Sequence, residues 1–226
     1  MGLTNPTEVI QNISHLGGSY HKLSFPDGTV LQGIFDMSRY LKYYQIPNLK
    51  GKTVLDVGTG TGYFAFEFAK MGAEVTAISD VIKEVHFAAN KLMGTDVKFL
   101  KKDLYTIDEK FGKFDIVFCS HVLQHIPDMF SAISKIYSVT KEQAIFGINI
   151  IGDKKWDDVP AAIFGGFKSE KNGGKFPTYW IPSRSCCVKM MQVAGFRNIK
   201  KISFFDLYGE EKKVNKIPTD VYHCFI

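Results

Sequence analysis

Apolar residues after position 50 alternate between short continuous runs and longer runs in which they recur every three to four positions. A continuous run predicts a buried strand, and the 3.6-residue repeat predicts an amphipathic helix. The predicted strands are Thr53–Val57, Glu74–Ser79, Val97–Leu100, Phe114–Cys119 and Gln143–Ile150. The predicted helices between them are Gly62–Met71, Val81–Leu92 and Pro127–Val139. Strands that alternate with helices are typical of a parallel sheet, so an α/β fold is expected.

The residues ahead of this core, 1–50, are called the front segment below. Asn5-Pro6 predicts the start of a short helix, because asparagine is a good cap and proline suits the first helical position. Pro26-Asp27-Gly28 lies between two apolar runs and predicts a hairpin turn. A second helix is expected after Asp36.

The residues behind the core begin with a stretch, 151–182, that is rich in glycine, proline and aromatic residues and long for a connection. Long loops on α/β scaffolds often cover a substrate, so this stretch is expected to be a cover loop over the active site. A helix capped by Ser183 and ending at Ala194 should follow, then a strand at Asn198–Phe205. Asp220–Ile226 is expected as a closing edge strand. The front segment, core and cover loop should form one domain, 1–226.

Composition narrows the class of protein. The 226 residues are 45% hydrophobic and 23% charged, and no apolar run approaches the ~20 residues of a membrane span. The first residues lack a signal-peptide pattern, so a cytoplasmic location and no membrane partner are expected. The four cysteines show no CxxC spacing and predict neither a zinc site nor a disulfide framework. The net charge of +5 comes mainly from dispersed lysines, which leaves RNA as a possible partner.

The stretch TVLDVGTGTGYFAF, residues 53–66, predicts a ligand-binding loop between a strand and a helix. Its glycines are spaced GxGxG, and Tyr63 stands where a dinucleotide loop needs a third glycine. The Gly-Lys-Ser/Thr ending of a P-loop is also missing. Asp56 at the strand end would repel a pyrophosphate and attract an ammonium group. The loop therefore favours a nucleoside that carries an amino-acid tail.

Polar residues near the ends of the next strands extend this site. Asp80 lies close to the position that binds ribose hydroxyls, although Ser79 could make that contact instead. Asp103 is placed to accept a hydrogen bond from an adenine amino group. The complete set of expected cofactor contacts is Asp56, Gly58, Thr59, Gly60, Gly62, Ser79, Asp80, Asp103, Leu104 and Ser120.

VLDVGTGTG, together with FDIVFCSHVLQHIPD at residues 114–128, resembles the class I S-adenosylmethionine-dependent methyltransferases. The resemblance implies a doubly wound, mostly parallel seven-stranded sheet with helices on both faces. It also implies S-adenosyl-L-methionine as the cofactor and S-adenosyl-L-homocysteine as the product, with no metal.

Two further stretches, YHKLSFPDGTVLQGIFD at 20–36 and TYWIPSRSCCVKMMQVAGF at 178–196, resemble the group related to the tRNA wobble-uridine oxyacetate methyltransferases. The members of this group that use carboxy-S-adenosylmethionine carry an arginine where this chain has Phe176, next to Lys175. Plain methyl transfer is therefore expected.

The acceptor side of the site is predicted from residues near the strand ends and in the flanking segments. Methyl transfer to a hydroxyl or an amine is helped by a base, and His121 and His21 are the candidates. His125 is expected to have a structural role, and HVLQH lacks the glutamate of a zinc-binding HExxH motif, so no metal is expected. The expected substrate contacts are Tyr20, Tyr179, Trp180 and Arg184.

The sequence thus predicts a methyltransferase that acts on a small-molecule acceptor at oxygen or nitrogen. Two alternatives remain open: a tRNA wobble-uridine (carboxy)methyltransferase, and a non-catalytic cofactor-binding regulatory module. The acceptor, the use of carboxy-S-adenosylmethionine and the oligomeric state are not determined by the sequence.

Overall fold

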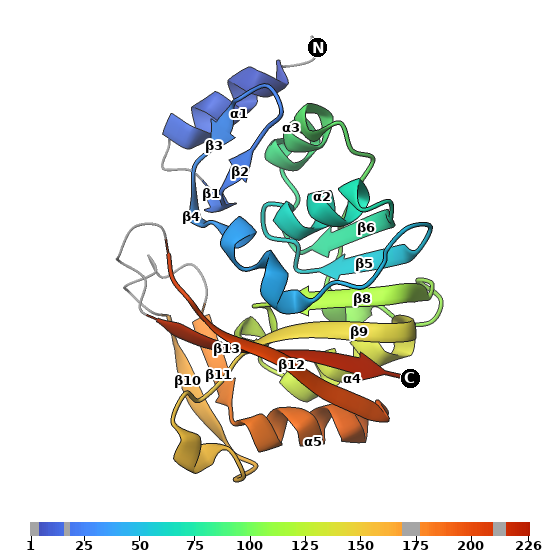
Figure 1. The fold of residues 1–226 in the computed structure, drawn as a ribbon, viewed down its shortest axis with the longest axis vertical. Helices are drawn as coiled ribbons and strands as arrows, with labels where there is room; N and C mark the ends of the chain where they lie inside the picture. Colours follow the sequence, from blue (N-terminus) through green and yellow to red (C-terminus); the bar gives the residue numbers. More distant parts are fainter. Residues whose placement is uncertain (1–4, 16–18, 169–176, 210–215) are drawn as a thin grey trace.

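The computed structural model describes residues 5–15, 19–168, 177–209 and 216–226. A seven-stranded sheet in the order β12-β13-β9-β8-β5-β6-β7 forms its centre (Figure 1). Strands β5 to β9 are mutually parallel, and β13 runs antiparallel to both of its neighbours. The strands are β5 Thr53–Val57, β6 Glu74–Ser79, β7 Lys98–Lys101, β8 Phe114–Ser120, β9 Thr140–Asn149, β12 Asn198–Leu207 and β13 Ile217–Phe225. The predicted doubly wound α/β fold is confirmed.

Helices cover both faces of the sheet because the central strands are apolar on both sides. One buried cluster joins the sheet to α1, α2, α3 and the front segment, and a second joins its other face to α4 and α5. The helices are α1 Pro6–His15, α2 Tyr63–Lys70, α3 Glu84–Met93, α4 Met129–Val139 and α5 Arg184–Ala194. As predicted, Ser183 caps α5 by accepting a hydrogen bond from the backbone nitrogen of Cys186.

The front segment contains short elements that pack on the first cluster. They are β1 Ser19–His21, β2 Leu23–Ser24, β3 Val30–Leu31, β4 Gly33–Phe35 and the 3-10 helices η1 Met37–Arg39 and η2 Leu41–Tyr44. The expected hairpin is present, because β2 pairs antiparallel with β3. The expected second helix is wrong. The chain makes two 3-10 turns instead and leaves them at Gln45, whose φ of 44° is left-handed; Pro47 also disfavours a helical Ile46.

The stretch 151–182 is more ordered than a cover loop. It contains the 3-10 helix η5 Lys154–Trp156 and an antiparallel pair, β10 Ala162–Lys168 and β11 Pro177–Pro182. The glycines that suggested a loop permit close strand pairing, since a Cβ on Gly165 would collide with the carbonyl oxygen of Thr178. Residues 169–176, which include Lys175 and Phe176, lie outside the described residues.

The expected closing edge strand is also wrong in its position. Strand β13 lies inside the sheet between β9 and β12, and β12 is the edge. Sequence order does not reveal this arrangement, because the last strand enters the sheet antiparallel, next to β9. Among the described residues, no helix is long and apolar enough to cross a membrane.

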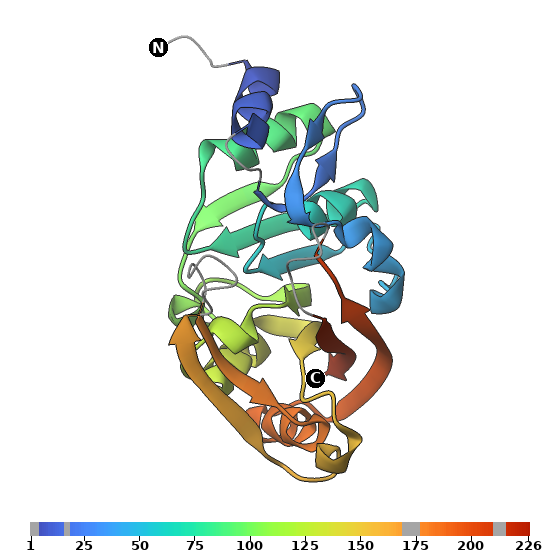
Figure 2. The same ribbon diagram turned by 90° about the vertical axis from the view of Figure 1, so that its left-hand side faces the viewer.

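The parallel strands end at one edge of the sheet, called the carboxyl edge below. Figure 2 looks toward this edge, with the front segment in blue at one end of the molecule and β10–β11 in orange at the other. In both views these two segments lie on opposite sides of the strand ends. Loops that follow parallel strands meet at such an edge, which is where ligands bind in open α/β sheets.

Candidate active site

The carboxyl edge brings together the residues that the sequence predicts as cofactor contacts. Strand β5 pairs in parallel with β6 and β8, and β6 pairs with β7, so the residues that follow these four strands are neighbours. From β7 to β8 across the edge, the polar side chains and their loops are Asp103, Ser79, Asp80, Asp56, the loop Gly58–Gly62, Ser120 and His121.

The glycine loop, residues 58–62, needs its glycines. Gly58 and Gly60 have φ of 70° and 59°, which side chains disfavour. A Cβ on Gly58 would also collide with the side chain of Val122, in the turn after β8. The backbone nitrogens of Gly58 and Thr59 both donate to the carbonyl oxygen of Ile78, at 2.9 and 3.2 Å. The loop is therefore fixed against β6 and against the β8 turn.

Two buried histidines hold this loop from its outer side. His86 Nε2 lies 2.9 Å from the carbonyl oxygen of Gly60, so that nitrogen carries the proton and donates. The His21 backbone nitrogen donates to Thr61 Oγ1 at 3.0 Å, and Thr61 donates back from its nitrogen to His21 Nδ1 at 3.4 Å. Burial, with smaller contributions from His121 and His86, lowers the pKa of His21 to about 3. His21 is therefore a neutral acceptor that supports the loop, and its suggested role as a base stays a prediction.

Asp56 is the buried acid of the site. Its side chain is 3% exposed, and its Oδ2 lacks a hydrogen-bond partner. Burial raises the pKa of Asp56 to about 7, against a smaller lowering by the Thr59 side chain nearby. Thr59 Oγ1 is itself buried without an aligned partner. A buried carboxyl group with an open oxygen is suited to a cation.

His121 directly follows β8 and has an unusual backbone, with φ of 55°. Its backbone nitrogen donates to the carbonyl oxygen of Gly147 at 2.9 Å, and its Nδ1 lies 2.8 Å from Asn149 Oδ1. Its Nε2 is buried and has no partner. Burial lowers the pKa of His121 to about 4, against a smaller raising by Asn149, so the ring is neutral at pH 7.

Buried polar atoms without partners are concentrated at the carboxyl edge. Four of the five such side-chain atoms among the described residues belong to the glycine loop, to its strand, or to the turn after β8: Asp56 Oδ2, Thr59 Oγ1, His121 Nε2 and Gln124 Oε1. Each unpaired buried group destabilises a protein by about 1–3 kcal/mol, so such a concentration points to a ligand that pairs with them. These atoms are mainly hydrogen-bond acceptors, so they fit a cofactor that donates from an ammonium group and from hydroxyls.

The remaining predicted cofactor contacts lie around this cluster. Asp80 is exposed and accepts from Ser79 Oγ at 3.1 Å, so both remain near the end of β6. Asp103 caps the 3-10 helix η3 Leu104–Thr106 by accepting from the Tyr105 backbone nitrogen at 2.8 Å. Ser120 Oγ lies 2.5 Å from the hydroxyl of the buried Tyr44, which ties the front segment to the end of β8.

The predicted substrate contacts separate into two groups. Tyr20 lies on the glycine loop, where a Cβ on Gly60 would be 3.2 Å from its ring. Trp180, on β11 next to Tyr179, donates its indole N–H to the carbonyl oxygen of Pro127 at 2.8 Å. His125 Nδ1 lies 2.7 Å from the carbonyl oxygen of Pro177, so it donates to the same strand. Trp180 and His125 fasten β11 to the turn after β8.

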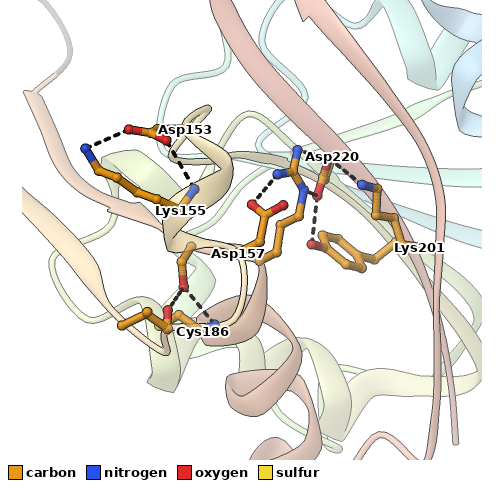
Figure 3. Close-up of polar contacts among 10 residues, drawn as sticks. Asp153, Lys155, Asp157, Cys186, Lys201 and Asp220 are labelled. Atoms are coloured by element: carbon orange, nitrogen blue, oxygen red, sulfur yellow. Dashed lines mark hydrogen bonds and ion pairs between the residues drawn. The ribbon is translucent and has the colours of Figure 1, made fainter.

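Arg184, the last predicted substrate contact, has carboxylate partners within the protein (Figure 3). Its guanidinium donates to Asp157 at 2.5 Å and to both oxygens of Asp220 at 2.8 and 3.4 Å. The Tyr222 hydroxyl donates to Asp220 at 3.0 Å, and Lys201 Nζ lies 3.5 Å from Asp220 Oδ1. This charged cluster joins the stretch before β10 to α5 and β13, so the guanidinium is engaged without an anionic substrate.

Sequence reasoning missed several residues of the site. Asn149, His86 and Gln124 each contact a predicted residue or the glycine loop. Asn149 and His86 belong to no quoted motif, and Gln124 lies within HVLQH but was not assigned a role. Asn149 had the strongest available signal, because it is a polar residue that ends a strand of six consecutive buried residues at the carboxyl edge. Within the part of the chain that the structure describes, no three histidine, cysteine or acidic side chains gather as metal ligands would.

Comparisons with known proteins agree with this geometry. The family described as a methyltransferase domain matches residues 48–177. A sterol 24-C-methyltransferase of Gibberella zeae is 30% identical over 138 residues, which are 58% of this chain and 36% of that protein. A ubiquinone biosynthesis O-methyltransferase of Azotobacter vinelandii is 35% identical over 98 residues, or 41% of each chain. The chain therefore spans about two fifths of the length of these relatives.

Among solved structures, the N-terminal domain of EvdMO1 with S-adenosylhomocysteine bound has a TM-score of 0.71 and 14% identity, over 99% of this chain and 98% of that one. This likeness concerns the fold and covers the front segment, the core and the C-terminal strands alike. The narrower resemblance to the tRNA wobble-uridine group is not reproduced by these comparisons and stays a prediction.

Proposed function

This chain belongs to the family of methyltransferase domains, and we propose that it transfers the methyl group of S-adenosylmethionine to an oxygen or nitrogen atom of a small molecule. One observation carries the proposal. The buried polar atoms without partners gather around the glycine loop, where a cofactor with a cationic amino-acid tail would pair with them. Most buried polar side-chain atoms in folded proteins have a partner, so four unpaired atoms in one place are unusual for a purely structural turn.

The residues of the carboxyl edge divide the binding task by their chemistry. Asp56 offers a carboxyl oxygen to the cofactor's ammonium group, and the glycine loop lets the ligand approach the backbone closely. Asp80 or Ser79 would accept from the ribose hydroxyls, and Asp103 from the adenine amino group. When bound, the cofactor supplies a methyl group on a positively charged sulfur, which an acceptor lone pair displaces in line.

His121 is the base that we assign to the acceptor side. Its ring is neutral at pH 7. Its Nε2 is buried without a hydrogen-bond partner, directly after the end of β8. The proton leaving the acceptor's hydroxyl or amine would pass to Nε2. The front segment excludes water, because Tyr20 and His21 cover the glycine loop. Much of the rate in such a displacement comes from holding the reactants in line within a dry site.

The nature of the acceptor rests on relatives whose names specify a sterol and a ubiquinone precursor pathway. These names favour a small molecule that accepts the methyl group at a carbon or an oxygen atom. We choose oxygen or nitrogen because a histidine base suits protons of hydroxyls and amines. RNA and a non-catalytic regulatory role are kept as outcomes of the test.

The test begins with calorimetric titration of the whole chain with S-adenosylmethionine and, separately, with carboxy-S-adenosylmethionine. We expect binding of the first with clear preference over the second, and an affinity about 30-fold lower in Asp56→Asn. Asp153→Asn is a matched control, because Asp153 is an acid that pairs with Lys155 on the surface. Preference for the carboxylated cofactor would favour the tRNA alternative, and binding of neither would contradict the proposal.

Turnover is then measured as S-adenosylhomocysteine formed with a panel of phenols, catechols, quinols and amines, and with total tRNA. Product with a small molecule supports the proposal. Product with tRNA alone would mean that the acceptor is RNA. Cofactor binding without any product, even when cell extract supplies the acceptors, would favour a regulatory module.

A further inference from the structure

We propose that Asn149 is the positioning residue that fixes His121 as the proton acceptor, a proposal that rests on the function above. Nothing in the sequence motifs marks Asn149, which is the last residue of β9. Its backbone is held in the sheet opposite Thr219 of β13, so the place of its side chain is set by the fold. The amide oxygen lies 2.8 Å from His121 Nδ1.

The remaining polar groups of His121 are also engaged. Its nitrogen donates to the carbonyl oxygen of Gly147 at 2.9 Å, and its carbonyl oxygen accepts from Gln124 Nε2 at 2.8 Å. The Phe205 ring lies edge-on to the imidazole at a centroid distance of 6.2 Å. Backbone, ring plane and Nδ1 are thus all fixed, and Nε2 alone is left open.

The backbone of His121 supports a functional reading of this arrangement. Its φ of 55° is in the left-handed region, which few residues other than glycine occupy, with asparagine, aspartate and histidine as the commonest exceptions. Glycine would adopt that conformation without strain, and a surrounding structure must hold any other residue there. Residues kept in such conformations are concentrated at active sites. The strain is consistent with a side chain that is needed at this point of the carboxyl edge.

Asn149 determines which nitrogen of His121 carries the proton. An amide oxygen can only accept, so Nδ1 must donate, and a neutral ring then has a lone pair on Nε2. Without this partner, nothing would favour that tautomer. In the reaction, the methyl–sulfur bond would break and leave its electron pair on sulfur as the acceptor's lone pair bonds to the methyl carbon, and the acceptor's O–H or N–H proton would move to the Nε2 lone pair. The resulting imidazolium keeps its Nδ1–H bond to Asn149 and returns the new proton to solvent.

The ionisable neighbours of His121 do not compete with it for the acceptor's proton. His125 and His21 are the ionisable side chains that interact electrostatically with it, from the β8 turn and the front segment. Burial lowers the pKa of both, so both are neutral at pH 7. A change at position 149 therefore acts on His121 without a titration of these two histidines near neutral pH.

Nitrogen NMR of the whole chain, labelled with ¹⁵N in its histidines and free of cofactor, tests the proposal. The His121 signals are assigned by their loss in His121→Gln. We expect an unprotonated Nε2 and a protonated Nδ1 in the wild type. Asn149→Ala should shift the ring toward the Nε2–H tautomer. Asn149→Asp should keep Nδ1–H and raise the pKa of His121 by about one unit or more, because a carboxylate favours the imidazolium.

Asn198→Ala is the matched control, since Asn198 is an exposed asparagine on β12. It should leave the His121 signals unchanged. In the turnover assay, Asn149→Ala should lower methyl transfer roughly 100-fold with little change in cofactor affinity, since a misplaced catalytic group commonly costs that much. Asn149→Asp should restore part of the rate.

An Nε2–H tautomer in the wild type, or an unchanged tautomer in Asn149→Ala, would overturn the assignment of Asn149. The spectra need no cofactor, so they decide this point even where S-adenosylmethionine fails to bind. That failure would instead contradict the proposed function.

Discussion

Two polar clusters of this molecule differ in whether their side chains have hydrogen-bond or ion-pair partners within the protein. At the carboxyl edge, Asp56, Thr59 and His121 each have a buried atom without a hydrogen-bond partner. In the cluster around Arg184, the guanidinium is shared between Asp157 and Asp220 (Figure 3). The first cluster is incomplete by itself, and the second is complete. The contrast separates polar groups that await a ligand from polar groups that hold the fold together.

The two clusters also differ in what surrounds their buried acids. Burial without a cation raises the pKa of Asp56 to about 7. Asp220 is fully buried as well, yet its carboxylate is neighboured by Arg184, the Tyr222 hydroxyl and Lys201. A buried carboxyl group is tolerated as an anion when cations and donors surround it. Substitutions at the two acids should therefore have opposite consequences for stability and binding.

The largest effect is expected for Asp220→Ala. Removing the carboxylate leaves Arg184 with Asp157 alone in a largely buried place, so the free energy of unfolding should fall by about 3 kcal/mol. Urea denaturation followed by circular dichroism measures it. Lys201→Ala is the control, because Lys201 is 42% exposed and its pairing should contribute less than about 1 kcal/mol. Equal losses in both variants would mean that the cluster is not a structural unit.

Asp56→Asn should act on binding instead. The substitution keeps the size of the side chain and removes the charge that we assign to the ammonium contact. We expect S-adenosylmethionine affinity to fall about 30-fold, which is roughly 2 kcal/mol, with no loss of stability in the free protein. Calorimetry and thermal unfolding measure the two quantities. If Asp56→Asn unfolded more easily but bound the cofactor normally, Asp56 would be a structural residue and not a ligand-binding one.

The pH dependence of binding tests the same acid in the wild type. With a pKa of about 7 in the free protein, Asp56 is mostly protonated at pH 5 and must lose its proton to face an ammonium group. Affinity should therefore rise about tenfold from pH 5 to pH 7 and level off above about pH 8. His21 and His121, with pKa values of about 3 and 4, do not titrate in this range.

Calorimetry in two buffers with different ionisation enthalpies would show the released proton directly. Asp56→Asn should release none and should show flat affinity over the same pH range. A wild-type affinity that is independent of pH would place the cationic group of the cofactor elsewhere.

The sequence predicted the first cluster better than the second. Strands β5 and β6 have the predicted bounds, because their continuous apolar runs and the glycine loop are local signals. Asp56, Gly58 and Gly60 could be identified in the same way. The Arg184 cluster joins Asp157, which follows η5, to residues of α5 and β13. These are distant in the sequence, and no local pattern specifies such pairing.

The same reason explains the errors in the C-terminal third. The glycines in 162–168 suggested a loop, but this segment pairs closely with β11. The residues of β13 do not by themselves indicate that this strand lies inside the sheet. Asn149 illustrates the limit within the site itself. The predicted strand ran to Ile150 and so enclosed Asn149, whereas β9 ends at this residue. Its contact with His121 depends on two strands and on a left-handed residue, which no periodicity records.

The smallest effect is expected for Trp180→Phe. This substitution tests whether β10–β11 stabilises the fold, as the Arg184 cluster does, or contributes to ligand binding, as the carboxyl edge does. The indole N–H donates to the carbonyl oxygen of Pro127, and phenylalanine keeps an aromatic ring without that donor. Loss of one such hydrogen bond should lower the free energy of unfolding by about 1 kcal/mol and leave S-adenosylmethionine affinity unchanged. Val193→Ala, on the exposed side of α5, controls for substitution of an apolar residue near this region. If Trp180→Phe instead weakened cofactor binding or methyl transfer without changing stability, Trp180 would belong to the acceptor site, and the hairpin would be part of the ligand-binding edge.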